Sequence, residues 1–328
     1  MRELLRTNDP VLISWLRALL ADAGIDAHVF DTHTSVLEGS AGAIPRRIMV
    51  AEADYEHGLS LYENSRALFE NTTKDATSTD QILGGRVLLR QPAQGYRTAI
   101  DPVLLAAAVC AKPGERVFDA GCGTGAASLC LAARVPGAEI FGIDTEPEFI
   151  ALARESGRLN RFEPAPAFEI ADLKDYGSDA AAARFDHVMS NPPFRASGSG
   201  QAPAHPLKMA AHVEGTVRLN EWIERCFGLL RPGGCFTMIH SQDRLPEVRT
   251  LTGAHAASGM IHPLWPKRRG AGCKRFIVQA VKPAADGSAG AEALRVTNGL
   301  VLHQGNGAYT DAADQILKSG ARLGFNFP

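Results

Sequence analysis

Short apolar runs of strand length alternate with amphipathic segments of helix length across residues 83–281. The run over 116–119, for example, is followed by a helix-length segment over 124–134, and the pattern then repeats. Because parallel strands need a crossover between them, repeated βα units predict a parallel sheet with helices on both faces. Two strand-like runs in succession, 260–265 and 275–281, close the series and predict one antiparallel edge strand.

Other segments flank this series. Residues 1–70 combine two helical stripes with short strand-like runs and predict a separate, small α+β domain. Residues 71–80 are polar, rich in Thr, Ser and Asp, and without periodicity, which is typical of a linker. The sheet-forming domain is expected over 81–282, and residues 283–328 are expected to add a strand and a helix as a C-terminal extension.

The composition is that of a globular protein. The chain has 328 residues, of which 45% are hydrophobic and 21% charged, so disordered and fibrous classes are excluded. A net charge of −2 excludes a global basic field, so a nucleic acid would have to bind a local patch. No run reaches the length of a membrane span, and no secretory signal opens the chain, which predicts a cytoplasmic protein without membrane contact. The oligomeric state is left open.

The cysteines give no sign of a metal site. The six cysteines are scattered, with no C-x-x-C pair and no Cys/His cluster at zinc spacing. They are expected to be reduced thiols of the core, and no metal is predicted.

A glycine-rich turn, DAGCGTG, occupies residues 119–125 after the first strand of the series. Its glycines allow a sharp turn and close approach of the backbone to a ligand. The spacing is G-x-G-x-G, unlike the G-x-G-x-x-G of dinucleotide sites, and Asp119 would repel a pyrophosphate. An ammonium group suits this carboxylate, so we expect S-adenosylmethionine, whose amino-acid end is a zwitterion without phosphate. The expected cofactor-binding residues of the turn are Asp119, Gly121, Cys122, Gly123 and Gly125.

Two more aspartates follow the next strands of the series. Asp144 ends the second strand, where a carboxylate can hold both hydroxyls of a ribose. Asp172 follows the third strand, where it can accept a hydrogen bond from the adenine amino group. Aspartates at strand ends also cap the helices that follow, which is the structural alternative for Asp172.

The sequence Asn-Pro-Pro-Phe at 191–194 follows a buried-looking strand and indicates methyl transfer to a planar nitrogen. An amine on an aromatic ring is a poor nucleophile because its lone pair is delocalised. The Asn191 side-chain oxygen and the Pro192 carbonyl can accept hydrogen bonds from its two N–H groups, while the Phe194 ring stacks on the substrate plane. Asn191 would also lie beside the cofactor; the alternative is that it only starts a turn. The expected catalytic residues are Asn191, Pro192, Pro193 and Phe194.

In this order, the glycine turn, Asp144, Asp172 and the Asn-Pro-Pro-Phe motif resemble the class I methyltransferases of the amino-methylating branch. Within that branch, other segments are most similar to the valine-tRNA adenine-N6 methyltransferases: Leu83-Gly84-Gly85-Arg86, Gly95-Tyr96-Arg97, Asp101-Pro102-Val103-Leu104-Leu105, 299–303 and 307–310. The resemblance implies a Rossmann-like sheet, S-adenosylmethionine as cofactor, and an adenine amino group in a tRNA anticodon loop as methyl acceptor. It also implies that Arg97 and Asp101 close over the methionine end of the cofactor.

Several alternatives remain beside this resemblance. A protein-glutamine N5 methyltransferase uses the same device but usually has Tyr in place of Phe194. Ribosomal-RNA guanine-N2 enzymes often have His in place of Arg195, and a DNA adenine-N6 methyltransferase is a further candidate. The alternative outside enzymes is a catalytically silent, cofactor-binding regulatory module.

Residues 1–70 resemble a family of small signal-transducing domains, in Leu5-Arg6-Thr7-Asn8-Asp9, Ala23-Gly24-Ile25 and Ile48-Met49-Val50. This likeness implies a fold and no defined activity. Since such a unit lies outside the core of the methyltransferases, it is expected to regulate the enzyme or to bind its substrate.

A basic loop, 267–275, joins the last two strands and has five Lys or Arg among nine residues. It leaves the sheet at the carboxyl ends of the strands, where open α/β sheets bind ligands, and can hold phosphates; a solvated turn is the alternative. The expected substrate-binding residues, with tRNA or another RNA as partner, are Arg195, Lys208, Lys267, Arg268, Arg269, Lys274 and Arg275.

Overall fold

The computed structural model describes residues 1–7, 10–30, 46–74, 77–93, 98–176, 185–193, 217–270, 272–285 and 294–324. The chain is divided into two compact units, Met1–Ala76 and Thr77–Pro328. None of the helices in the described ranges is both long enough and apolar enough to cross a membrane.

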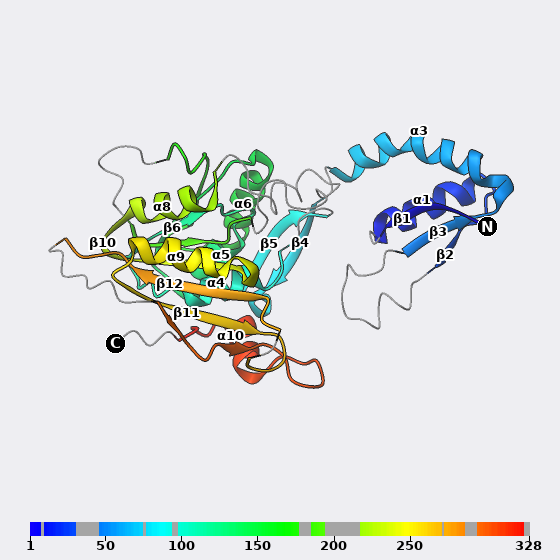
Figure 1. The fold of residues 1–328 in the computed structure, drawn as a ribbon. Coiled ribbons are helices and arrows are strands. Elements are labelled where there is room, and N and C mark those ends of the chain that lie inside the picture. Colours follow the sequence, from blue (N-terminus) through cyan, green and yellow to red (C-terminus); the bar gives the residue numbers. More distant parts are fainter. Residues whose placement is uncertain are drawn as a thin grey trace. The chain divides into compact units, whose positions relative to one another are not determined.

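The first unit is a small α+β fold, as expected. Its strands β1 (Arg2–Thr7), β3 (Arg46–Val50) and β2 (His28–Phe30) pair antiparallel in that order (Figure 1). The helices α1 (Pro10–Asp22) and α3 (Tyr55–Lys74) pack on each other, and a short 3₁₀ turn, η1 (Glu52–Asp54), precedes α3. Leu16, Leu20 and Ile48 lie at the centre of the unit and are fully buried.

The expected linker over 71–80 is largely regular structure. Helix α3 continues to Lys74, and strand β4 (Thr77–Ile82) pairs antiparallel with β5 (Val87–Pro92) across the turn η2 (Leu83–Gly85). Alternate residues of β4 are exposed, so its polar sequence fits the water-facing side of a two-stranded ribbon. Polarity without an apolar stripe is therefore a poor linker signal here, although the boundary between the units does fall inside this stretch, at 76/77.

The second unit is built on a mostly parallel sheet, which confirms the α/β class. Its strand order is β13-β11-β12-β10-β9-β6-β7-β8, with β14 also paired to β11. The strands are β6 (Arg116–Ala120), β7 (Glu139–Asp144), β8 (Ala167–Ile170), β9 (Phe185–Ser190), β10 (Leu230–Ser241), β11 (Ser258–Trp265), β12 (Arg275–Val281), β13 (Arg295–Val296) and β14 (Leu300–Val301).

The sequence predicts an antiparallel strand at the edge of the sheet, and this position is wrong. Strand β12 lies between β10 and β11 and runs antiparallel to both, while β13 and β14 pair with β11 on its outer side. All five central residues of β12 are buried. The sequence shows that β11 and β12 are consecutive, but their lateral order depends on which strand pairs with β10.

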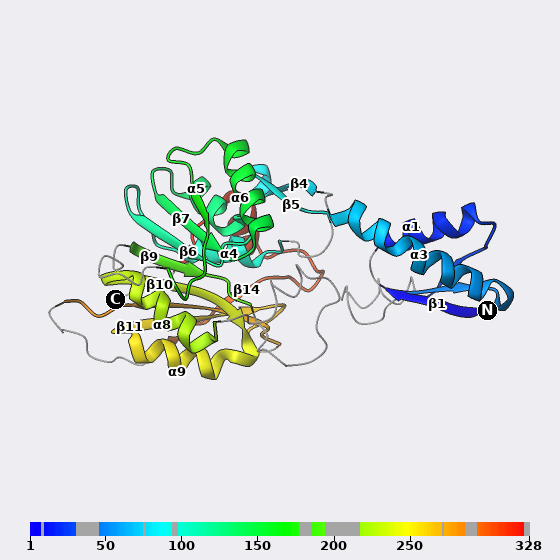
Figure 2. The same cartoon turned by 90° about the horizontal axis from the view of Figure 1, so that it is seen from above.

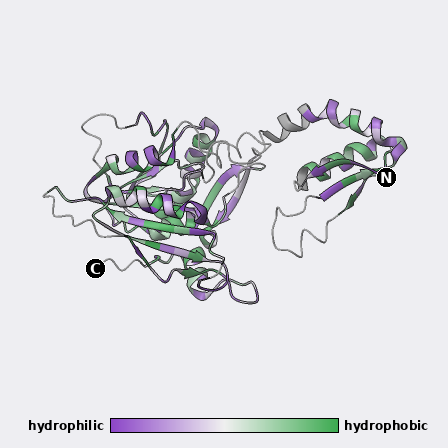
Figure 3. Cartoon of the chain, in the orientation of Figure 1, coloured by the Kyte–Doolittle hydropathy of each residue, from purple (hydrophilic) through white to green (hydrophobic). Residues whose placement is uncertain are grey.

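Helices cover both faces of the sheet. Residues of α4 (Asp101–Ala108), α5 (Ala126–Arg134) and α10 (Asp311–Ser319) join one hydrophobic core, and those of α8 (Leu219–Leu229) and α9 (Leu245–His255) join the other. Helix α6 (Pro147–Asn160) packs on β5, β7 and β8, and the turn η3 (Gln242–Arg244) leads into α9. Figure 2 shows α5 and α9 on opposite sides of the strands. In Figure 3, many residues of the central strands are coloured as hydrophobic.

The C-terminal segment is an integral part of this unit. Leu300, Leu302, Ile316 and Leu317 are buried in the same core as α4 and α5. A Cβ atom on Gly299 would lie 2.2 Å from the Pro263 carbonyl oxygen, so only glycine lets this segment pack against β11. The tail is thus one of the layers of the fold.

Candidate active site

The glycine turn after β6 is tightly packed, with each of its glycines at positive φ. Gly121 has φ +72°, and a Cβ atom there would lie 3.1 Å from the Trp222 ring. Gly125 has φ +82° and precedes α5; a Cβ atom there would lie 2.9 Å from the Phe168 ring. Glycine is therefore required at both positions, by conformation and by space.

Asp119 lies under this turn and is nearly inaccessible, with 1% of its surface exposed. Its Oδ2 accepts a hydrogen bond of 2.6 Å from the hydroxyl of Ser128 on α5. Burial above all, with a smaller contribution from the negative charge of Asp144, raises the pKa of Asp119 to about 7, although the hydrogen bond from Ser128 acts to lower it. A buried carboxylate beside a second acid is a good partner for a cationic group.

Asp144 and Asp172 come next along the same edge of the sheet. Asp144 Oδ2 accepts from the Gly123 amide at 2.9 Å and Oδ1 from the Glu146 amide at 3.0 Å, so this carboxylate also holds the glycine turn. Burial raises the pKa of Asp144. Asp172 Oδ1 accepts from the Lys174 amide at 2.9 Å, so it caps a turn over 173–176, where the alternative expects a helix. Each carboxylate oxygen has a second lone pair, so ligand binding stays open to both.

Asn191 follows β9, the strand beside β6. Because Ser190 pairs with Ala120, Asn191 comes out of the sheet next to the glycine turn. Its side-chain oxygen is shielded from solvent and accepts no hydrogen bond within the described part of the chain. Unsatisfied buried acceptors are rare, so this oxygen is a candidate to accept a hydrogen bond from a ligand. Pro192 is buried and Pro193 half-buried, whereas Phe194 lies outside the described residues.

Two residues that the sequence did not single out connect these parts. The Trp222 indole N–H donates to the Ser190 hydroxyl at 3.0 Å, and that hydroxyl donates to the Ala120 carbonyl at 2.8 Å. The same indole ring lies against Gly121. Trp222 therefore links α8, the end of β9 and the glycine turn. The only sequence signal was a large aromatic residue on an amphipathic helix, which is normally a core residue.

Asp101 and Arg275, expected to bind cofactor and substrate respectively, contact each other. Arg275 Nε lies 3.1 Å from Asp101 Oδ2, and both side chains are partly exposed. This ion pair joins the start of α4 to the start of β12. Lys267, Arg268, Arg269 and Lys274 are exposed around the carboxyl end of β11. Arg97, Arg195 and Lys208 lie outside the described residues.

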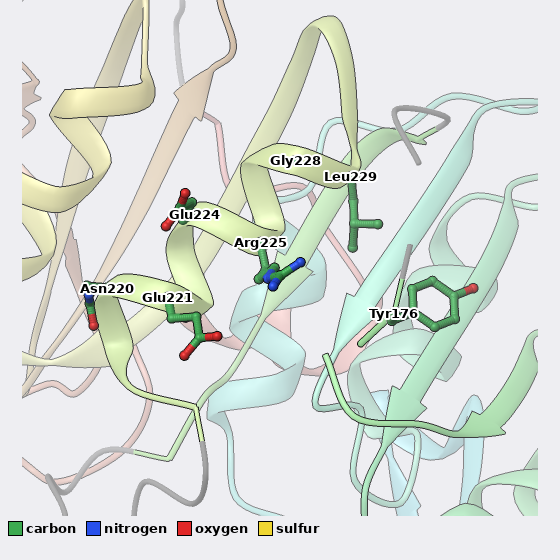
Figure 4. A pocket seen from close by; sticks show the side chains of 7 residues that line it. All are labelled: Tyr176, Asn220, Glu221, Glu224, Arg225, Gly228 and Leu229. Atoms are coloured by element: carbon green, nitrogen blue, oxygen red, sulfur yellow. The ribbon is translucent and has the colours of Figure 1, made fainter. Parts of the chain in front are cut away.

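A pocket of about 470 Å³ lies elsewhere on the second unit, beside α8. Its lining residues are Tyr176, Asn220, Glu221, Glu224, Arg225, Gly228 and Leu229. Figure 4 shows Leu229 and Arg225 of α8 on one side of this space and Tyr176 on the other. None of the residues expected to bind cofactor or substrate lines it.

Comparison with known proteins assigns both units. Residues 1–66 match the family described as "Putative prokaryotic signal transducing protein", and residues 111–262 match the family described as "Methyltransferase domain". A tRNA1(Val) (adenine(37)-N6)-methyltransferase of Porphyromonas gingivalis is 33% identical over 183 residues, which cover 54% of this chain and 71% of that protein. The enzyme of the same name from Aeromonas salmonicida is 24% identical over 222 residues, which cover 67% of this chain and 88% of that enzyme.

The fold also has a counterpart among solved structures. The crystal structure of a protein described as a predicted O-methyltransferase from Agrobacterium tumefaciens superposes with a TM-score of 0.54 at 24% identity. The match covers 69% of this chain and all of that one. It confirms the Rossmann-like methyltransferase fold.

Proposed function

Because this chain belongs to the family of the tRNA1(Val) (adenine(37)-N6)-methyltransferases, we propose that it methylates the N6 amino group of an adenine in a tRNA anticodon loop. The chain is an S-adenosylmethionine-dependent N-methyltransferase. The observation that carries the proposed substrate chemistry is the buried side-chain oxygen of Asn191 at the end of β9, which accepts no hydrogen bond from any described residue.

The described residues fit the cofactor at each of its polar ends. Asp119 offers a buried carboxylate to the ammonium group, and the glycine turn allows the close approach that this contact needs. Asp144 faces the ribose hydroxyls, and Asp172 accepts a hydrogen bond from the adenine amino group. S-Adenosylmethionine supplies an activated methyl group, so the protein needs neither a metal nor a covalent intermediate for the transfer.

Asn191 and Pro192 polarise the acceptor amine. The Asn191 oxygen and the Pro192 carbonyl each accept a hydrogen bond from one N–H group of the adenine amine, which directs the nitrogen lone pair toward the methyl group. Phe194 stacks on the base and fixes its plane. Transfer is then a direct, in-line displacement that depends on positioning. The amine proton leaves once the C–N bond has formed.

Replacing Asn191 tests this role. Asn191→Ala is expected to lower turnover by about 10²-fold or more, the usual cost of removing a preorganised hydrogen-bonding group from a reacting centre. Affinity for S-adenosylmethionine, measured by calorimetry, should stay within about threefold, because Asp119 and the glycine turn are intact. Asn220→Ala, at an exposed position of α8, is the matched control and should behave as the wild type. Normal turnover of Asn191→Ala would contradict the assignment.

The substrate class is tested with labelled methyl donor and four classes of acceptor: tRNA, ribosomal RNA, DNA and protein. A valine tRNA transcript is expected to be methylated, and the same transcript with guanine in place of adenine 37 is not. Ribosomal RNA, duplex DNA and a release-factor protein serve as the competing acceptors. Preferential labelling of any of these three would reject adenine in tRNA as the substrate, while Asn191→Ala would still test N-methyl transfer as such.

A further inference from the structure

A cluster of two thiols and an imidazole lies at the opposite end of the sheet from Asn191. Cys110 follows α4, His187 is on β9 and Cys235 is on β10. Their ligand atoms, two sulfurs and one ring nitrogen, all lie within 4.8 Å of one another. His187 pairs with Cys235 in the parallel register of β9 and β10, so the two side chains share one face of the sheet. The cysteines are free thiols in the structure.

Glu115 determines which nitrogen of His187 can act as a ligand. Glu115 Oε2 accepts the backbone N–H of Lys112 at 2.8 Å and lies 2.9 Å from His187 Nε2, so Nε2 carries the hydrogen and donates it. The lone pair of the neutral ring is then on Nδ1. This atom is buried and has no hydrogen-bond partner within the described residues. A carboxylate that orients an imidazole in this way is the usual outer partner of a metal-binding histidine.

Cys110 has an outer partner as well. Gln279 Nε2 lies 3.3 Å from Cys110 Sγ and 2.8 Å from the Ala108 carbonyl oxygen, and the Gln279 side chain is completely buried. An amide N–H directed at a sulfur stabilises the thiolate form that binds metals. Cys110 is half-buried, which leaves one side of the cluster open to water.

From this geometry we propose that Cys110, His187 and Cys235 bind a Zn²⁺ ion that fastens the end of α4 to β9 and β10. Two thiolates neutralise the dication, and sulfur with imidazole is a preferred ligand set for zinc. With Zn–S bonds of about 2.3 Å, a tetrahedral ion holds its ligand atoms roughly 3.7 Å apart, so binding needs movements of about 1 Å, within reach of a change of cysteine rotamer. Water on the open side of Cys110 completes the coordination.

The site stands apart from methyl transfer. It lies near the amino end of β9 and beside the middle of β10, whereas Asn191 follows the carboxyl end of β9. Its role is therefore to stabilise the larger unit, and the three ligands, far apart along the chain, meet only through the pairing of β9 with β10 and the packing of α4.

Zinc binding by the full chain tests the proposal. The protein, stripped with a chelator under reducing conditions, is expected to bind one Zn²⁺ per chain in competition with a chromophoric chelator. Cys110→Ser and Cys235→Ser should each lower the affinity at least about 100-fold, and Glu115→Gln about 10- to 100-fold. Cys130→Ser, a buried thiol of α5 outside the cluster, is the control and should bind as the wild type does. Failure of the wild type to bind, or unchanged binding by Cys235→Ser, would overturn the proposal.

Measurements on the wild type test the zinc site even if the variants fail to fold. Co²⁺ should produce thiolate-to-metal charge-transfer absorption, and its absence would count against sulfur ligation. Zn²⁺ should slow alkylation of Cys110 and Cys235, read by mass spectrometry, and leave that of the half-exposed Cys273 unchanged. Equal alkylation with and without the ion, or a Cys110–Cys235 disulfide that forms in air despite saturating Zn²⁺, would reject the site.

Discussion

The carboxyl of Asp119 titrates near neutral pH because it is buried. Its pKa is raised to about 7, so an appreciable fraction is protonated at pH 7 when no cation is bound. Between about pH 4 and pH 7, the folded state therefore keeps a proton on Asp119 that the unfolded state has already lost. The stability that this proton contributes is fully present below about pH 4 and is lost as pH rises through about 7. An ammonium group bound beside Asp119 would favour its charged carboxylate over the protonated form and would lower its pKa.

Affinity for S-adenosylmethionine should therefore depend on pH through Asp119. We expect it to fall as pH drops below about 7, by up to about tenfold per pH unit, because only the ionised carboxylate pairs with the ammonium group. Calorimetry between about pH 5 and pH 9, in two buffers of different ionisation enthalpy, should show a proton released on binding near pH 6.

Asp119→Asn is the control for this dependence. It should bind S-adenosylmethionine weakly, without the transition near pH 7. The same transition in that variant would assign the titration to another group. Asp144, whose pKa is also raised by burial, would be the next residue to replace.

Among the elements, the loop between β11 and β12 has an unequal distribution of its charges. Lys267, Arg268 and Arg269 are exposed, whereas Arg275 is paired with Asp101. Exposed cations at the carboxyl edge of the sheet can contact phosphates, and Arg275 instead holds the end of the loop in place. The five basic residues that look equivalent in the sequence therefore differ in what they offer to RNA.

Reversing the charge of Lys267, Arg268 and Arg269 together is expected to raise KM for tRNA and to flatten its dependence on salt, since fewer counterions are released on binding. The value of kcat at saturating tRNA should change little. Steady-state kinetics over a series of salt concentrations provide the measurement. Reversing Arg158 and Arg161, exposed at the end of α6, is the matched control. Unchanged KM and salt slope would show this loop to be a solvated turn.

For the molecule as a whole, the division into two units separates cofactor binding from the N-terminal segment. Every residue expected to bind cofactor lies in the second unit, and the partners described above for Asp101, Asp119, Asp144 and Asp172 belong to the same unit. The first unit has its own hydrophobic core around Leu16 and Ile48. It has the features of an independently folding domain.

A chain that lacks residues 1–76 is therefore expected to fold and to bind S-adenosylmethionine within about threefold of the full chain. Circular dichroism checks the fold and calorimetry the affinity. A folded but non-binding truncation would contradict the separation. Comparing KM and kcat for tRNA between the two chains then distinguishes a substrate-binding role of the first unit, which raises KM when lost, from a regulatory one.

Local patterns in the sequence predicted much of the fold and part of the site. Alternating strand and helix periodicity indicated the βα units, because side-chain spacing is set within each element. The glycine turn, Asp144 and Asp172 could be placed at strand ends for the same reason, since each lies at or within two residues of the end of its own strand. Asn191 could likewise be placed, whereas the direction of its side chain could not.

Contacts between segments that are distant in the sequence could be seen only in the tertiary structure. The insertion of β12 between β10 and β11 depends on lateral strand pairing, which leaves no periodic trace in the sequence. The ion pair of Arg275 with Asp101 depends on where β12 lies, and the hydrogen bond from Trp222 to Ser190 depends on the packing of α8 on β9. Cys110, His187 and Cys235 meet through the pairing of β9 with β10 and the packing of α4, which is why their spacing along the chain suggested no metal. Periodicity specifies each element, and the burial of all of them in a common core specifies which residues become neighbours.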